Sequence, residues 1–180
     1  MAARTAASLH LDGVRVPDAN RLGEQGRGFR VAMSALDKGR MSIAAGCVGI
    51  ARGCLEAATE YAGQRVQFGK PIAGHQLVQE LLADTAVDLD AGRMLTWLAA
   101  DLLDRGEPMS LAASKAKLFA SEAAVRAANN CLQVFGGYGY VEDYPVGKYL
   151  RDARVMTLYE GTSQMQKLII GRALTGIPAF

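Results

Sequence analysis

The chain has 180 residues, which suits one domain, and half of the residues are hydrophobic while 21% are charged. That composition is typical of a globular protein and excludes a disordered one. The 20 basic and 18 acidic residues leave a net charge of +2, so no strong field attracts nucleic acid or an anionic membrane, and neither is expected as a partner.

The first predicted element is a short strand pair near the N-terminus. Residues 1–7 lack the apolar region of a secretory signal and are expected to be a disordered lead. In residues 8–16, apolar side chains alternate on either side of Asp12-Gly13, which predicts a strand pair or a strand remnant. Two strands alone are not stable in water, so this segment needs something else to pair with.

Helical periodicity begins after a Gly-rich connector at residues 23–28. The first helix is expected to be about 36 residues and roughly 50 Å long, with a bend at Gly39. Together with short loops, the helices predict an all-α, up-and-down helical bundle with a short N-terminal strand remnant. Five helices are expected, at about 29–64, 75–104, 110–134, 145–154 and 163–174.

The most informative stretch is Tyr159-Glu160-Gly161-Thr162-Ser163-Gln164. Ser163 and Gln166 have capping-box spacing, which predicts that a helix begins at Ser163. Glu160 then lies just outside a helix N-terminus, on a loop with a Gly hinge. It is either a solvated acid that interacts with the helix dipole or a carboxylate base at the edge of a pocket.

Two further stretches leave alternatives open. The glycines of Phe135-Gly136-Gly137-Tyr138 either end a helix or allow close backbone approach to a ligand. Arg65 follows the first helix, where it either stabilises the helix C-terminus or reaches a phosphate.

Metal and membrane sites are not expected. The three cysteines, Cys47, Cys54 and Cys131, include no CxxC pair, and only two histidines accompany them. Reduced, mostly buried thiols in a cytoplasmic protein are therefore expected, and no metal. No apolar run reaches the length of a membrane span.

The order and spacing of seven motifs resemble the acyl-CoA dehydrogenase family, in its C-terminal helical domain. The resemblance covers the chain from about Leu9 to its end, and although each motif is weak, their joint order is highly specific. The motifs are Gly28-Phe29 with Leu36-Asp37-Lys38-Gly39-Arg40, Arg65-x-x-Phe68-Gly69-Lys70, His75-Gln76, Gln133-Val134-Phe135-Gly136-Gly137, Tyr144-Pro145, Arg151-Asp152-Ala153-Arg154 and Tyr159-Glu160-Gly161-Thr162-Ser163-Gln164.

The resemblance implies a flavin-dependent α,β-dehydrogenation of an acyl-CoA thioester. Glu160 matches the base that removes the α-proton, while the β-hydrogen leaves as hydride to FAD. An α-proton of a thioester is a very weak acid, so the carbonyl must be polarised as charge develops. In the family, the backbone N–H of the base residue and a flavin hydroxyl polarise it. Some members place the base at the position of Gly39, which cannot serve here.

The resemblance also assigns binding residues. Most cofactor contacts are expected across a subunit interface, whereas those of Thr162 and Gln164 are within one subunit. Arg40, Tyr159 and Gly161 are expected on the acyl-CoA side. The residues expected to bind FAD are Arg65, Gln67, Phe68, Gln76, Gln133, Gly136, Gly137, Thr162 and Gln164.

Family members carry an N-terminal helical domain and a middle β domain before this region. Residues 1–22 are therefore expected to be a lead and a remnant of the β domain, and residues 23–180 the helical C-terminal domain. The expected partners are the acyl-CoA substrate, an electron-accepting flavoprotein, and either a second copy in a dimer or tetramer or a chain with the missing domains. Two alternatives remain: a non-catalytic helical assembly module, and an acyl-CoA oxidase of the same superfamily.

Overall fold

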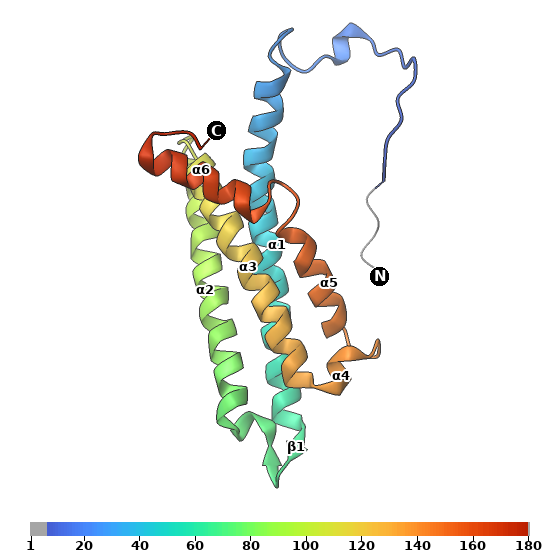
Figure 1. Cartoon of the computed structure of the whole chain (residues 1–180), viewed down its shortest axis with the longest axis vertical. Helices are drawn as coiled ribbons and strands as arrows, with labels where there is room; N and C mark the ends of the chain where they lie inside the picture. The colour runs from blue at the N-terminus through green and yellow to red at the C-terminus, as the bar shows by residue number, and fades with distance from the viewer. Residues whose placement is uncertain (1–6, 180) are drawn as a thin grey trace.

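Three long helices, of which the second is antiparallel to the first and third, form the body of the protein in a computed structural model that describes residues 7–179 (Figure 1). They are α1 (Gly28–Gln64), α2 (Gln76–Asp104) and α3 (Ser110–Phe135). α3 lies at the centre and packs against α1 and α2 as well as against three shorter helices. The predicted all-α, up-and-down bundle is confirmed.

Shorter elements connect and cover the long helices. α5 runs back along α3, and α6 crosses the end of the bundle where α3 begins (Figure 1). Between α1 and α2, a small antiparallel hairpin stands where the sequence predicted only a loop. The elements are η1 (Asp18–Asn20), β1 (Val66–Gln67), β2 (Lys70–Pro71), η2 (Ile72–Gly74), α4 (Gly137–Tyr140), α5 (Val146–Met156) and α6 (Ser163–Thr175).

The helices pack closely because their facing side chains are small. α1 contributes a buried stripe at spacings of four and three residues, and α3 contributes alanines at more than half of its buried positions. Small side chains let two helix backbones approach each other without voids. The stripe on α1 consists of Ala44, Cys47, Ala51, Cys54, Ala58 and Ala62.

The N-terminal segment differs from the prediction. Residues 8–16 form no strand and have no ladder partner among residues 7–179. The side chains of Leu9 and Leu11 are 88% and 80% exposed. The prediction of strands was wrong for these residues in this chain, because a ladder needs a neighbouring strand and the described part of the chain offers none. The lead at residues 1–6 lies outside the described residues.

The expectation that no apolar run reaches the length of a membrane span was wrong for helix α1. It contains an 18-residue window with a mean hydropathy of 1.3, so it is long and apolar enough to cross a membrane by length and composition alone. Its small-residue stripe packs against α3. α1 also continues through Gly39 without interruption.

Candidate functional site

The loop between α5 and α6 presents Glu160 in a strained backbone conformation. Glu160 has a φ of 55° and Gly161 a φ of 88°, and a non-glycine residue at positive φ is uncommon. The loop ends at Thr162, whose hydroxyl accepts a hydrogen bond from the backbone N–H of Met165 at 3.2 Å. The predicted start of the helix at Ser163 is confirmed, but the capping side chain is that of Thr162.

The carboxylate of Glu160 rests against the backbone of α1 at Gly39. A Cβ atom at Gly39 would lie 2.9 Å from Cδ of Glu160 and closer still to Oε2. Oε2 is buried and has no hydrogen-bond partner. Buried polar atoms are nearly always paired, so an unpaired carboxylate oxygen calls for an explanation such as a catalytic role.

Arg40 follows Gly39 in the sequence, but its guanidinium forms an ion pair with Asp37. Its Nη1 donates to Oδ1 of Asp37 at 2.7 Å, and the hydroxyl of Ser110 donates to the same oxygen at 3.0 Å. Arg40 is only 7% exposed. The ion pair with Asp37 thus occupies the Nη1 of Arg40.

Two buried side chains donate hydrogen bonds to the backbone of the loop. Nζ of Lys117, on α3, donates to the carbonyl oxygen of Gly161 at 2.7 Å. The side-chain amide of Gln166 donates to the carbonyl oxygens of Glu160 and Gly161 at 3.1 and 3.0 Å. Lys117 and Gln166 are both fully buried. The capping-box pattern assigned Gln166 a different partner, and the structure shows that it supports the loop instead.

Burial dominates the electrostatics around the loop. It raises the pKa of Cys47 to about 12 and also raises that of Tyr159, where the charges of Cys47 and Glu160 add to the effect. Burial lowers the pKa of Lys117. Charges that lie in the buried part of this site interact more strongly than they would in water.

The second group of predicted residues lies at the opposite end of the bundle. A cavity of about 980 Å³ opens between the end of α1, the end of α3 and α4. Arg65, Gln67, Gly136 and Gly137 line it together with aromatic side chains. The guanidinium of Arg65 lies 5.6 Å from the ring centroid of Tyr138, a cation–π distance that holds it over the cavity.

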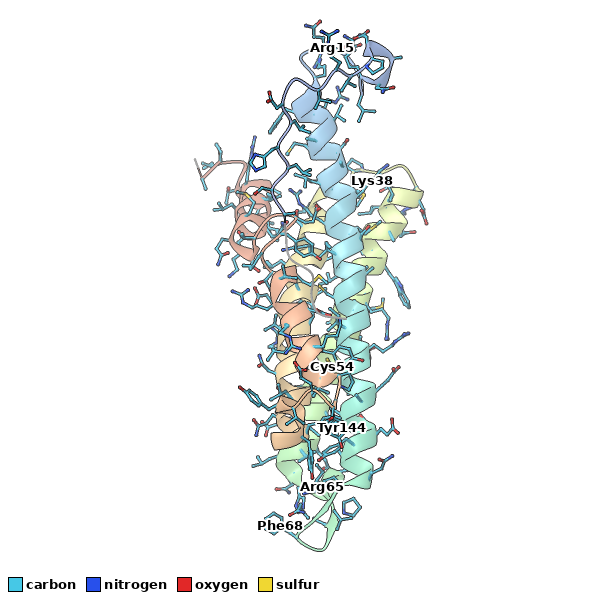
Figure 2. All side chains as sticks on the ribbon, turned by 90° about the vertical axis from the view of Figure 1, so that its right-hand side faces the viewer. Arg15, Lys38, Cys54, Arg65, Phe68 and Tyr144 are labelled. Atoms are coloured by element: carbon cyan, nitrogen blue, oxygen red, sulfur yellow. The ribbon has the colours of Figure 1, made fainter. Side chains whose placement is uncertain are left out.

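Three other predicted residues lie near this cavity without lining it. Phe68 is 92% exposed at the tip of the hairpin, with a φ of 53°. Gln76 begins α2, and Gln133 lies in the last turn of α3; both are exposed. Figure 2 shows Arg65 and Phe68 together at the hairpin end. These exposed side chains are free to contact something outside the chain.

The two groups of residues do not meet within one chain. Between Gly39 and Arg65, α1 has 26 residues (65 minus 39), which correspond to roughly 39 Å of helix. Lys38 and Arg65 accordingly lie at well-separated levels in Figure 2. Thr162 and Gln164 lie at the same end as Glu160.

Among residues 7–179, no three side chains of the types that bind metal ions lie together.

Comparison with known families gives one result that covers most of the chain. The family model described as "Acyl-CoA dehydrogenase, C-terminal domain" matches residues 26–175. The chain is 52% identical over 168 residues to an acyl-CoA dehydrogenase of Bacillus subtilis, covering 93% of this chain and 44% of that protein. It is 43% identical over 176 residues to a short-chain specific acyl-CoA dehydrogenase of Megasphaera elsdenii, covering 97% and 46%.

Solved structures agree with the fold. The butyryl-CoA dehydrogenase of Megasphaera elsdenii superposes with a TM-score of 0.87 at 45% identity, over 88% of this chain and 42% of the other. A glutaryl-coenzyme A dehydrogenase in complex with glutaryl-CoA superposes with a TM-score of 0.88 at 40% identity, over 92% and 42%. The chain thus spans less than half the length of the relatives that it matches.

Proposed function

Because the chain belongs to the acyl-CoA dehydrogenase family, in its C-terminal domain, we propose that it takes part in the α,β-dehydrogenation of an acyl-CoA thioester. Glu160 is the general base. The single observation that carries this assignment is its buried, unpaired Oε2, held by a strained loop against Gly39. A solvated acid at a helix N-terminus, the plain alternative, would have neither the burial nor the strain.

The reaction needs a carboxylate base that has no ion-pair partner and lies beside the α-carbon of the substrate. Glu160 takes the α-proton of the thioester on its carboxylate, while its backbone N–H stands ready to donate to the carbonyl oxygen where charge develops. Bound FAD supplies the acceptor for the β-hydrogen, which leaves as hydride. Arg40 and Tyr159 border the acyl-CoA side, and Asp37 keeps the guanidinium of Arg40 off the base.

The cavity at the hairpin end suits the diphosphate half of FAD. Arg65 brings a positive charge, and the exposed backbone of Gly136 and Gly137 allows close approach of a ligand. Its volume lies within the range of small-molecule sites, roughly 300–1,000 Å³. A solved structure described with FAD and proline is 28% identical to this chain, with a TM-score of 0.87.

The separation of the two groups implies a shared site. A dinucleotide that touches Thr162 and Gln164 does not also reach Arg65 of the same chain, since the two ends lie so far apart. We therefore infer that a second copy completes each FAD site, in a dimer or tetramer. The uncovered apolar side chains on α2 support self-association, because contiguous exposed apolar surface marks interfaces. They include Leu77, Val87, Met94, Trp97 and Leu98.

Other chains are also part of the proposal. Residues 23–180 act as the helical C-terminal domain, and a β domain completes the pocket. One structural neighbour comes from work on an electron transferring flavoprotein of Acidaminococcus fermentans, which supports a flavoprotein as electron acceptor. Another is a prolyl acyl carrier protein oxidase, 32% identical, which keeps an oxidase as the second candidate.

The visible spectrum tests this proposal. The assembly formed by the chain with its partner domains should carry flavin, and anaerobic addition of an acyl-CoA should bleach it. Replacing Arg65 with Gln should lower flavin content, whereas Arg52→Gln, at an exposed position on the same helix, should not. A colourless assembly, or a flavin that no acyl-CoA bleaches, would favour the assembly module. Rapid reoxidation by oxygen would favour the oxidase.

A further inference from the structure

We propose that Lys117 is a positioning residue for the catalytic loop: with the amide of Gln166, its buried ammonium fixes the carbonyls of Glu160 and Gly161 and thereby aims the carboxylate at substrate. This inference rests on the proposed role of Glu160 as the base. It adds two residues that touch neither substrate nor cofactor and act through the loop alone.

The surroundings of Lys117 exclude an ordinary ion pair. Its side chain is 0% exposed, and among residues 7–179 no carboxylate oxygen lies within 4.0 Å of its Nζ. Its hydrogen bond goes to the carbonyl oxygen of Gly161 at 2.7 Å. A buried lysine without a paired charge is costly and rare. Burial accordingly lowers its pKa.

The hydrogen bonds restrain both peptide units that follow Glu160. A carbonyl oxygen has two lone pairs, and for Gly161 they meet Lys117 at 2.7 Å and Gln166 at 3.0 Å. The same amide nitrogen of Gln166 also reaches the carbonyl oxygen of Glu160 at 3.1 Å. The orientation of this amide follows from the pattern, since its oxygen would repel both carbonyls.

This restraint explains how the strained backbone persists. A non-glycine residue at positive φ is held there only when its surroundings over-determine it. Gly161 contributes in a second way, because a Cβ at this position would lie 2.6 Å from the amide nitrogen of Gln166. With the two carbonyls fixed, the backbone of Glu160 keeps the position from which its side chain reaches Gly39.

A purely structural role would be to tie α3 to α6, and another pair already does that. The hydroxyl of Ser163 donates to Oε1 of Glu122 at 2.5 Å, which links α6 to α3 five residues beyond Lys117. Glu122 touches neither loop carbonyl. Glu122→Ala is therefore the matched control, since it removes a tie between the same two helices and leaves the loop restrained.

The first test needs no activity. A glutamyl endopeptidase cleaves after Glu160 only when the loop opens, and cleavage follows the population of the open form. Lys117→Met should speed this cleavage by about tenfold or more, and Glu122→Ala by less than about twofold. Cleavage after Glu80, inside α2, reports global unfolding. Equal acceleration at Glu80 and Glu160, or none at Glu160, would overturn the proposal.

The second test uses the flavin-loaded assembly. Lys117→Met should lower kcat by about 10-fold to 100-fold with KM for acyl-CoA nearly unchanged, because the base is misplaced while the substrate site is intact. Gln166→Met should act in the same direction and serves if the first variant does not fold. A kcat equal to that of the parent would count against positioning. If Glu160 proves not to be the base, the cleavage test still decides whether Lys117 holds the loop.

Discussion

Replacing Gly39 with Ala tests the contact between α1 and the carboxylate of Glu160, the proposed base. The new Cβ would lie 2.9 Å from Cδ of Glu160 and closer still to Oε2, whereas ordinary contact begins at 3.4 Å. The carboxylate must therefore retreat by more than the 0.5 Å (3.4 minus 2.9) that Cδ alone requires. A misplacement of about 1 Å can cost about 10²-fold in rate. We expect flavin reduction by acyl-CoA to slow by about 10-fold to 100-fold, or roughly 1.4–2.7 kcal/mol in the barrier.

Stability should respond differently from activity. Ala gains about 1 kcal/mol over Gly in a helix interior, and crowding against a side chain that can turn offsets roughly that amount. The midpoint of urea unfolding should therefore stay near that of the parent. Gly49→Ala is the matched control, since no atom lies within 4 Å of its added Cβ; it should raise stability and leave the rate alone. A Gly39→Ala variant with the parental rate would refute the contact.

Three further substitutions probe the same site. Gly161→Ala places a Cβ 2.6 Å from Nε2 of Gln166 at a φ of 88°, so thermal unfolding should show a loss of about 1–3 kcal/mol; unchanged stability would contradict the strain. Asp37→Asn releases Arg40 to pair with the catalytic carboxylate, so kcat should fall about tenfold while Asp37→Glu retains it; equal rates in both variants would argue against this. Burial raises the pKa of Cys47 to about 12, so the unfolded chain releases this proton first and the free energy of unfolding should fall by about 1.4 kcal/mol per pH unit above about pH 9. Urea titrations of the parent and of Cys47→Ala should diverge there, and parallel curves would refute the burial effect.

The sequence was sufficient for the helices because their signals are local. Periodic apolar residues, glycine at helix ends and proline in loops placed all three long helices within one or two residues of their observed ends. Gly136, with a φ of 60°, ends α3 as its composition predicted. The strand pair at residues 8–16 failed for the opposite reason, because a strand is stabilised by a neighbour and not by its own sequence.

The proposed base, Glu160, was assigned from motif order, but the residues that support its loop were not predicted. Lys117 comes from α3, far in sequence from the loop, and only the packing of helices brings it there. Asp37, which binds Arg40, comes from α1. One signal was available for Lys117, which stands in register with Ala113, Ala120 and Ala124 on the buried stripe of α3. A lysine in a stripe of alanines indicates a buried charge with a specific partner. Gln166 was assigned to a capping box because its spacing fits one.

Single-turnover reduction of the flavin tests the central claim most directly. Glu160→Gln keeps the shape of the side chain and removes its basicity. In the flavin-loaded assembly, anaerobic mixing of this variant with acyl-CoA should bleach the flavin about 10²-fold to 10⁴-fold more slowly than the parent does, with flavin content and thermal stability unchanged. Bleaching at the parental rate would show that another group removes the α-proton, and the assignment of Glu160 would fall.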